Sequence, residues 1–188
     1  MPAVFLVSDT HFGHAGVCRF TREDGSKLRP WNDPAEMDEA MIQAWNQRVR
    51  PTDKVYHLGD CVINRKALKT LARLNGDKVL IRGNHDIFRD DEYRQYFREL
   101  RAYHVMNGLI LSHIPIHEDS LGRFGVNIHG HLHASRVKKD GVIDVRYHCV
   151  CVEQLPDFAP ILFEDVIKRI EKEGGTVGFR NGNGPQVD

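Results

Sequence analysis

The sequence predicts an α/β fold, and the order of its apolar segments is the main reason. In the first half, three short apolar runs at 4–7, 54–58 and 78–81 alternate with segments of helical periodicity at 34–50 and 65–74. Each of the three runs ends in a polar cluster. Because the carboxyl ends of parallel strands meet at one edge of a sheet, we expect a parallel arrangement that gathers these clusters there.

The first predicted strand and the helix after it have clear boundaries. The run at 4–7 is rich in valine and leucine and ends at Asp9. After an irregular stretch containing several glycines, Asp33, the proline that follows it and Glu36 form the pattern of a helix N-cap, a proline at the first helical position and a capping-box acid. The predicted helix over 34–50 carries its apolar residues on one face, which is typical of core packing. That face comprises Met37, Met41, Ile42, Trp45 and Val49.

The strand–helix pattern then repeats, and the second half of the chain differs from it. A helix is predicted at 65–74, stopped by Asn75-Gly76-Asp77 before the third strand. Short strand candidates follow close together and favour sequential pairing in a second sheet, with a last helix after them at 163–172. The strand candidates are 109–112, 126–129, 142–146 and 149–152.

Length and composition favour one domain with one site. A chain of 188 residues can bury a sizeable core, and we assign 1–173 to a single domain. The remaining residues, 174–188, are a polar tail rich in glycine and asparagine that we expect to be flexible.

Charge and targeting signals exclude several classes of function. Lys plus Arg and Asp plus Glu both number 26, so no global basic field exists to attract nucleic acid, although a local basic groove is not excluded by this count. The N-terminal apolar run has no basic flank and is short, so it does not resemble a signal peptide, and no run approaches the roughly 20 apolar residues of a membrane span. We therefore expect a cytoplasmic protein whose four cysteines are reduced thiols.

Histidine is present in surplus, and the histidines recur beside acidic and amide side chains directly after apolar runs. There are 11 histidines in the chain. Taken singly, a fragment such as Gly59-Asp60 could be an ordinary turn, and a lone histidine could be a satisfied core residue. Together the fragments supply two aspartates, one asparagine and four histidines: Asp9, His11, Asp60, Asn84, His113, His131 and His133.

These side chains predict a metal site of a particular kind. Oxygen and imidazole ligands without thiolates suit Mn²⁺, Fe or Zn²⁺ better than a closed structural zinc site. Seven such groups are too many for one tetrahedral ion, but they suit two ions that share a carboxylate. Two ions roughly 3.5–4 Å apart can activate a hydroxide and neutralise phosphoryl oxygens.

The order of the fragments resembles that of the calcineurin-like metallophosphoesterase family, especially its small bacterial and phage-type members. The fragments are D-x-H, G-D, G-N-H-D, S-H-x-P and G-H-x-H, and the resemblance spans about residues 4–152. It implies a fold of two mixed β-sheets packed as a sandwich and flanked by helices. It also implies that Asp9, His11 and His133 hold one metal ion.

The same resemblance implies roles for the other residues. Asn84, His113 and His131 would hold the second ion, and Asp60 would bridge the two. His85 would be the catalytic residue, stabilising the transition state or protonating the leaving oxygen, a role suited to a group with a reference pKa of about 6.5.

One fragment departs from a branch of the family. Protein serine/threonine phosphatases read G-D-x-x-D-R-G, whereas this chain reads GDCVIN, with Ile63 and Asn64 in place of the aspartate and arginine. This difference argues against that activity.

Two further residues are candidate substrate contacts. His14 follows His11 by three residues and is a candidate substrate contact, with an indirect or structural role as the alternative. Arg82 is a candidate phosphate clamp, because a guanidinium can bind phosphate in a bidentate way. The histidines at 57, 104, 129 and 148 are interpreted as strand or surface residues.

The predicted activity is hydrolysis of a phosphate ester by a dinuclear metal centre. Two divalent ions are expected, Mn²⁺ first, with Fe, Zn, Ni or Co as alternatives. A phosphodiesterase acting on small or nucleotide-like diesters through a metal-bridging hydroxide is favoured, since no accessory domain or basic surplus suggests a larger partner. The alternatives are a phosphomonoesterase, a nuclease acting on nucleic-acid ends, and a metal-binding interaction module without turnover.

Membrane partners are not expected, and the oligomeric state cannot be read from the sequence.

Overall fold

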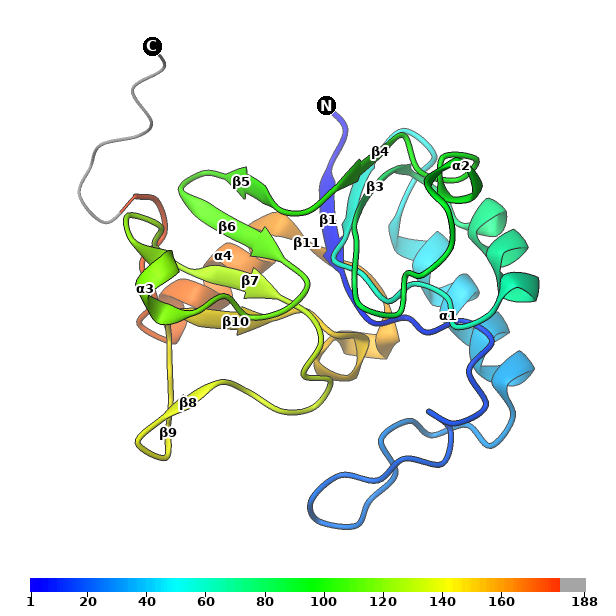
Figure 1. The fold of residues 1–188 in the computed structure, drawn as a ribbon, viewed down its shortest axis with the longest axis horizontal. Coiled ribbons are helices and arrows are strands. Elements are labelled where there is room, and N and C mark those ends of the chain that lie inside the picture. Colours follow the sequence, from blue (N-terminus) through cyan, green and yellow to red (C-terminus); the bar gives the residue numbers. More distant parts are fainter. Residues whose placement is uncertain (180–188) are drawn as a thin grey trace.

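Two mixed β-sheets packed against each other form the centre of the molecule in the computed structural model, which describes residues 1–179 (Figure 1). The larger sheet has the strand order β11-β1-β2-β3-β4. Its strands β1 to β4 are parallel, and β11 pairs with β1 in the antiparallel direction. The bounds are β1 Val4–Val7, β2 Lys54–His57, β3 Asp77–Ile81, β4 Glu99–Arg101 and β11 Ile161–Leu162.

The second sheet comes from the later part of the chain and has the order β10-β7-β6-β5. Strands β10, β7 and β6 are parallel, and β5 pairs with β6 as an antiparallel hairpin. The bounds are β5 His104–Met106, β6 Leu109–Ser112, β7 Asn127–His129 and β10 Tyr147–Cys149. The predicted α/β sandwich of two mixed sheets is confirmed.

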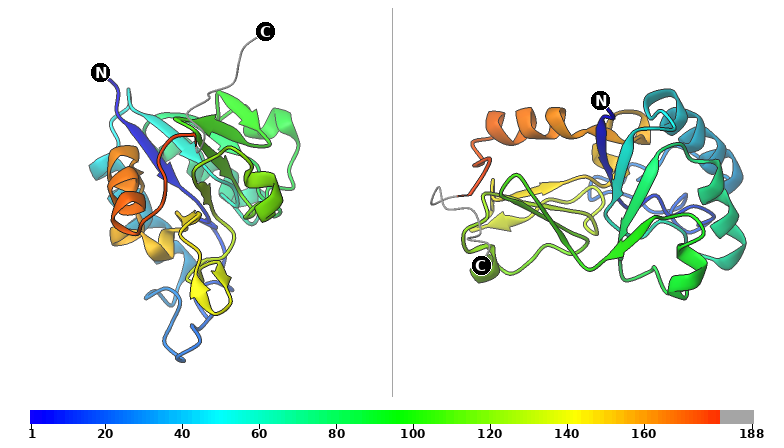
Figure 2. Two further views of the ribbon diagram at one scale, coloured as in Figure 1. Left: turned by 90° about the vertical axis from the view of Figure 1, so that its left-hand side faces the viewer. Right: turned by 90° about the horizontal axis from the view of Figure 1, so that it is seen from above.

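Helices flank the two sheets, as Figure 2 shows from two further directions. The helices that follow β1, β2 and β3 lie on the outer side of the larger sheet, whereas α4 runs along the other side of the sandwich (Figure 2). Their bounds are α1 Pro34–Arg48, η1 Arg65–Arg73, α2 Asp90–Tyr93, α3 Glu118–Leu121, η2 Val152–Gln154, η3 Pro156–Phe158 and α4 Phe163–Lys172. Within residues 1–179, none of these helices is long and apolar enough to cross a membrane.

Helix α1 begins where its N-cap predicts. The carboxylate of Asp33 accepts hydrogen bonds from the backbone N–H groups of Ala35 and Glu36. The predicted apolar face is buried in the core, and the indole N–H of Trp45 is satisfied by the carbonyl of Asn75 at 2.9 Å. The helix ends at Arg48, two residues before the predicted end, because the backbone of Val49 is extended.

The helix predicted at 65–74 is present as the 3₁₀ helix η1. Its N-cap is Asn64, whose side chain accepts the N–H of Ala67 at 3.0 Å. Ala67, Leu68 and Leu71 are buried against the larger sheet's core. The periodicity therefore located the element, while the tighter winding was not readable from it.

Two strand predictions in the second half are wrong. The expected strand at 142–146 is only the two-residue strand β9 Val142–Ile143, which forms an exposed hairpin with β8 Lys138–Lys139. Asp144 ends it, because its side chain accepts the N–H of Arg146 and its carbonyl accepts the N–H of Tyr147, which turns the chain. The next strand is β10, which spans Tyr147–Cys149 and therefore begins two residues before the predicted strand at 149–152.

The segment after β10 joins the two sheets. Ser8, directly after β1, forms a parallel bridge with Cys151, and the N–H of Ser8 donates to the carbonyl of Val150 at 2.9 Å. The carboxyl ends of β1 and β10 therefore lie side by side. This contact brings the loops at the ends of both sheets to one place.

The predicted polar tail is described only in part. Phe179 forms a bridge with Phe124, and their ring centroids lie 6.2 Å apart. The rest of the predicted tail, 180–188, lies outside the described residues.

Candidate active site

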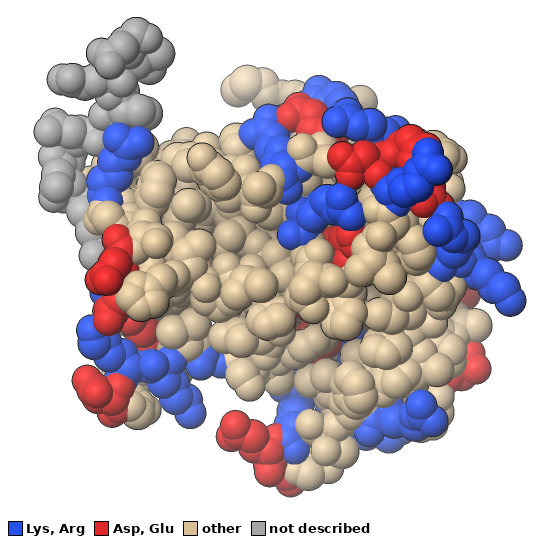
Figure 3. Space-filling view, viewed as in Figure 1, with Lys and Arg blue, Asp and Glu red and all other residues tan. Residues whose placement is uncertain are grey.

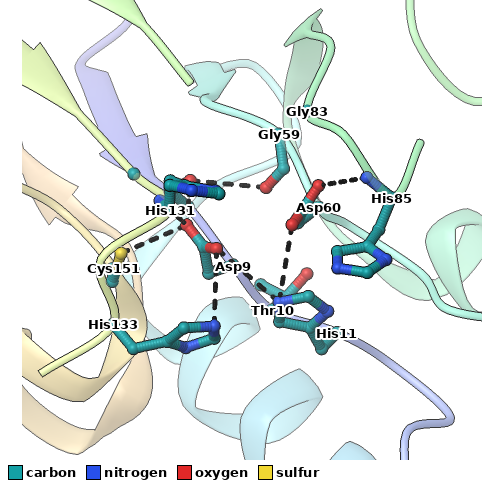
Figure 4. Close-up of polar contacts among 12 residues, drawn as sticks. Asp9, Thr10, His11, Gly59, Asp60, Gly83, His85, His131, His133 and Cys151 are labelled. Atoms are coloured by element: carbon teal, nitrogen blue, oxygen red, sulfur yellow. Dashed lines mark hydrogen bonds and ion pairs between the residues drawn. The ribbon is translucent and has the colours of Figure 1, made fainter. Parts of the chain in front are cut away.

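The predicted metal ligands follow five strands and converge where the two sheets meet (Figure 4). Three loops of the larger sheet carry Asp9 and His11 after β1, Asp60 after β2, and Asn84 after β3. The second sheet contributes His113 after β6, and His131 and His133 after β7. The sequence predicted that the polar clusters would meet at one edge of a sheet. In the structure, the loops of both sheets contribute to this meeting point.

The backbone at this edge is unusual. Five of the predicted ligands have a left-handed backbone, with φ of 58° at Asp9, 49° at His11, 55° at Asp60, 68° at His131 and 50° at His133. Aspartate and histidine adopt this conformation more readily than most residues, but it still disfavours folding locally. Such conformations cluster at functional sites, because they aim side chains that a regular strand would direct elsewhere.

Two glycines allow the loops to approach closely. A Cβ at Gly83 would lie 2.2 Å from Oδ1 of Asp60, and a Cβ at Gly130 would lie 2.5 Å from Oδ2 of Asp9. Any larger residue at either position would displace a carboxylate of the cluster. The glycines of the G-N-H-D and G-H-x-H fragments are therefore required by the packing of this edge.

Asp9, His11 and His133 form one group of possible ligand atoms. Nε2 of His11 lies 3.6 Å from Oδ1 of Asp9, and Nε2 of His133 lies 3.9 Å from the same oxygen. The rings of His11 and His133 stack with centroids 5.1 Å apart. Atoms at this spacing can share one ion without touching each other.

Asn84, His113 and His131 form a second group. Oδ1 of Asn84 lies 2.9 Å from Nε2 of His113 and 3.0 Å from Nδ1 of His131. The other nitrogen of His113 is 2.8 Å from the carbonyl of Leu58. Since that carbonyl can only accept, Nδ1 of His113 carries the proton, and Nε2 presents its lone pair to the cluster.

Asp60 lies between the two groups. Its Oδ2 is 3.7 Å from Nε2 of His11 and 3.5 Å from Nε2 of His113. Its Oδ1 accepts the backbone N–H of His85 at 2.8 Å (Figure 4). One carboxylate therefore faces both groups, as a bridging ligand must.

Unpartnered buried atoms indicate that the site is built for cations. Among the described residues, Oδ1 of Asp9 and both ring nitrogens of His11 are buried without a hydrogen bond. Burying polar atoms in this way is costly unless a partner such as a metal ion satisfies them. Burial alone would raise the pKa of Asp9, but its interactions with the adjacent His11 and His113 rings and the hydrogen bond from the Ser8 hydroxyl hold it well below its usual range, so the carboxylate is ionised.

Comparison with known proteins agrees with this geometry. The model of the calcineurin-like phosphoesterase family matches residues 3–173. The chain belongs to the calcineurin-like phosphoesterase family. As a member it is a metal-dependent phosphoesterase, and the predicted family resemblance is confirmed.

Similar proteins extend over nearly the whole chain. An uncharacterized protein of Methanocaldococcus jannaschii is 34% identical over 177 residues, which cover 92% of this chain and 93% of the relative. The crystal structure of a protein of unknown function from Aquifex aeolicus has a TM-score of 0.67 and 25% identity, covering 90% of this chain and 100% of its own. An archaeal phosphodiesterase has a weak likeness, with a TM-score of 0.42 and 19% identity over 79% of this chain and 81% of its own.

His85, the predicted catalytic residue, lies beside the phosphoesterase cluster. Its ring centroid is 5.6 Å from that of His11, and the side chain is exposed to solvent (Figure 4). The bond from its N–H to Asp60 holds its backbone against the cluster. The ring is thus placed at the rim of the cluster, where a substrate would enter.

Asp86, the last residue of the G-N-H-D fragment, connects two loops of the cluster. Its buried carboxylate accepts the backbone N–H groups of Asp60 at 2.8 Å, Cys61 at 3.0 Å and Gly83 at 2.8 Å. The carboxylate therefore ties the loop after β2 to the loop after β3. It sets the position of Asp60 from behind.

His14 lies next to the cluster but is turned toward a neighbouring loop. Its ring is 5.6 Å from that of His11 and 5.8 Å from that of Phe20. Burial, together with the charges of His11 and Arg29, lowers the pKa of His14 to about 4. It is therefore a neutral group near neutrality.

The structure does not support Arg82 as a phosphate clamp. Its guanidinium donates to the carbonyls of Asp86 and Phe88 and to the carboxylate of Asp90, the last at 2.7 Å. The guanidinium also lies over the ring of Tyr93, 5.4 Å from the ring centroid. Arg82 stabilises the loop that follows His85, and four of its five guanidinium N–H donors are engaged by these oxygens, so it lacks the two free donors of a bidentate phosphate contact.

Sequence reasoning missed a buried ion pair behind the cluster. Glu153 accepts from Nε of Arg29 at 2.8 Å, and its Oε1 is 3.0 Å from Nδ1 of His133. Arg29 also donates to the carbonyls of Asp9 at 2.6 Å and Thr10 at 2.7 Å. The only signal in the sequence is a single glutamate within the otherwise apolar run Cys149-Val150-Cys151-Val152-Glu153.

Proposed function

We propose that this phosphoesterase is a dinuclear metal-dependent phosphodiesterase that hydrolyses small or nucleotide-like phosphodiesters. The observation that carries the proposal is the convergence of seven imidazole, carboxylate and amide side chains from five loops, with one carboxylate facing both halves of the set. The buried and unpartnered atoms of Asp9 and His11 fit divalent cations.

The proposed ligand assignment follows the two groups. Asp9, His11 and His133 would hold one ion, and the second would be held by Asn84, His113 and His131. Asp60 would contribute to both, because its Oδ2 faces one histidine of each group. Ions bound here would activate water at neutral pH and neutralise charge on the phosphoryl oxygens. Mn²⁺ is the proposed metal, with Fe, Zn, Ni or Co as alternatives for the same ligand set.

His85 is the proposed general acid. Its exposed ring lies at the rim of the cluster on a backbone held by Asp60, where it would donate a proton to the oxygen that leaves when the phosphorus–oxygen bond breaks. A histidine is suited to this transfer, because its reference pKa is close to neutrality. Asp86 and Gly83 support it by keeping the two loops in contact.

The engagement of the arginines near the cluster favours a diester over a monoester. A monoester dianion carries one more negative charge than a diester, and free cationic donors would stabilise that charge. Arg29 and Arg82, which contact the loops of the cluster, are both engaged by protein oxygens. A diester makes no such demand.

Surface charge favours a small substrate over nucleic acid. On the face shown in Figure 3, Lys and Arg side chains lie in mixed groups with Asp and Glu near the edges, and a broad uncharged area lies between these groups. Proteins that bind nucleic acid through the phosphate backbone present a continuous basic surface. A small diester needs only the cluster and its immediate walls.

The direct test uses two chromogenic esters. Protein stripped with a chelator is reloaded with Mn²⁺ and assayed with bis(p-nitrophenyl) phosphate and p-nitrophenyl phosphate. We expect metal-dependent turnover with faster cleavage of the diester. Faster cleavage of the monoester would replace the proposal by a phosphomonoesterase, and no turnover with metal shown to be bound would favour the non-catalytic module.

The role of His85 is tested in the same assay. His85→Ala should lower kcat by roughly 10²–10⁴-fold while the metal content, measured by mass spectrometry, stays unchanged. His117→Ala is the matched control, because the His117 side chain is 75% exposed and accepts the backbone N–H of Asp119 in its own short helix. Normal turnover in the His85 variant would refute the assigned role.

A further inference from the structure

A groove beside the cluster is formed by two hairpins that project from the same end of the molecule (Figure 2, left). One is the loop at 20–28, in which Leu28 N–H donates to the Phe20 carbonyl at 2.8 Å and Thr21 bridges Lys27. The other is the β8–β9 hairpin. The cavity between them has a volume of about 740 Å³, which is in the range of small-molecule sites.

The groove adjoins the proposed active site. His133, one of the predicted ligands, forms part of its wall. Ring contacts also lead from the cluster toward it: His11 to His14 at 5.6 Å, and His14 to Phe20 at 5.8 Å. A group attached to a phosphate at the cluster would therefore extend into this groove.

The walls carry apolar and aromatic surface that the fold does not cover. Phe20 is 49% exposed and Ile143 is 43% exposed, and both line the groove together with Leu28 and Leu132. Exposed large apolar residues on opposite walls of one cavity are typical of a site for a flat ring.

The charges in the groove are mixed in sign. Arg22, Arg136 and Lys138 lie with Glu23 and Asp24; Arg136 is paired with Glu173, and the carboxylate of Asp24 already accepts from Ser26 at 2.9 Å. A channel for a nucleic-acid strand would be uniformly basic. This mixture suits a single neutral, hydrogen-bonding substituent better than a chain of phosphates.

We propose that this groove binds the nucleoside of a nucleotide diester, with the base against Phe20 and the phosphate at the cluster. The inference rests on the proposed phosphodiesterase function and names its substrate class. It makes Phe20 and Ile143 specificity-determining residues.

The experiment compares two diesters that release the same leaving group. Both p-nitrophenyl thymidine 5′-phosphate and methyl p-nitrophenyl phosphate lose p-nitrophenolate, so they differ only in the substituent that stays on phosphorus. We expect kcat/KM to be at least about tenfold higher for the thymidine ester, since stacking of a base on an aromatic side chain is worth roughly that factor.

Variants then locate the preference. Phe20→Ala should lower the ratio of the two kcat/KM values about tenfold, and Ile143→Ala should lower it in the same direction. Tyr103→Ala is the matched control, because Tyr103 is also a largely exposed aromatic residue, at 59%, and does not line the groove. Both rates come from one preparation, so any loss of folded protein cancels in the ratio.

The outcomes separate this inference from the function on which it rests. His85-dependent turnover with equal rates for both esters, or a preference that survives Phe20→Ala, would overturn the inference and leave the phosphodiesterase intact. If neither ester is turned over, the proposed function fails. Calorimetric titration with thymidine 5′-monophosphate then decides the groove separately: binding that weakens in Phe20→Ala supports it, and absent or unchanged binding overturns it.

Discussion

Nδ1 of His133 lies 3.0 Å from Oε1 of Glu153, and the same oxygen accepts Nε of Arg29 at 2.8 Å. One buried carboxylate therefore connects an imidazole of the cluster to the guanidinium that holds the loop of Asp9. Burial would raise the pKa of Glu153, but the charge of Arg29 and the hydrogen bond with His133 hold it below its usual value. Glu153 thus stays ionised and directs Nε2 of His133 toward Asp9.

Removing the charge of Glu153 should weaken metal binding. In Glu153→Gln we expect the affinity for Mn²⁺ to fall about tenfold, because partners of a ligating histidine typically contribute this much. Competition with a chromophoric chelator measures the affinity. Glu39→Gln is the control, since Glu39 forms an exposed pair with Arg73. Equal affinities in the two variants would show that Glu153 only stabilises the fold.

Asp60→Asn tests the residue that faces both groups. The amide can still accept the N–H of His85, but it replaces a charged oxygen that lies 3.5 Å from His113 by a neutral group. We expect the metal content to fall and turnover to be lost, while circular dichroism stays unchanged. Asp91→Asn, at an exposed carboxylate, should retain both properties. Full metal occupancy in Asp60→Asn would exclude a bridging role.

Asp86 should matter for stability as well as for activity. Asp86→Ala leaves the backbone N–H groups of Asp60, Cys61 and Gly83 without their acceptor. We expect the free energy of unfolding to fall by about 3 kcal/mol or more, because each buried unsatisfied donor is costly. Asp86→Asn, which keeps one acceptor oxygen, should lose less. Urea denaturation of the two variants measures the difference, and equal losses would contradict this account.

The stability of the metal-free protein should depend on pH through buried histidines. Burial lowers the pKa of His57 from an ordinary value near 6.5 to about 4, so the folded state holds this ring neutral while the unfolded state takes up a proton. The free energy of unfolding should therefore fall as the pH drops from 6.5 toward 4, by on the order of 1 kcal/mol per pH unit for this group. Denaturant titrations between pH 7 and pH 4.5 measure the slope.

The variant His57→Gln isolates this contribution. His57 accepts the N–H of Gly59 at 3.2 Å and lies 3.0 Å from the hydroxyl of Thr10, contacts that a neutral amide can imitate. The slope should be shallower in the variant, although His129 and His148, whose pKa values burial also lowers to about 4, keep it from vanishing. An unchanged slope would remove His57 from the explanation.

The strand-end clusters could be predicted from the sequence because their two signals, an apolar run and the polar residue directly after it, are neighbours in the chain. An apolar run followed at once by aspartate, histidine or asparagine marks a ligand position, and no knowledge of distant contacts is needed. β1, β2 and β3 were located in this way. β4 and β11 escaped prediction, because three- and two-residue strands are too short to show a periodicity.

The supporting groups could not be predicted, because their partners are far away in sequence. Arg29 and Glu153 are 124 residues apart, and neither has a pattern that points to the other. Arg82 follows β3 as directly as Asn84 does, yet its long side chain reaches the carbonyls of Asp86 and Phe88. Chain order gives the position of such a residue, but the direction of a flexible side chain depends on the acceptors that folding places around it.

The left-handed backbone at five of the cluster residues gives the site a mechanical consequence. These loops hold strained conformations at the one place where the ends of both sheets converge, and the four cysteines of the chain are free thiols. Cations shared by loops of both sheets would offset that strain and tie the two halves of the sandwich together. They would serve this chain as a cross-link serves a secreted domain, so that depletion of metal would loosen the scaffold together with the chemistry.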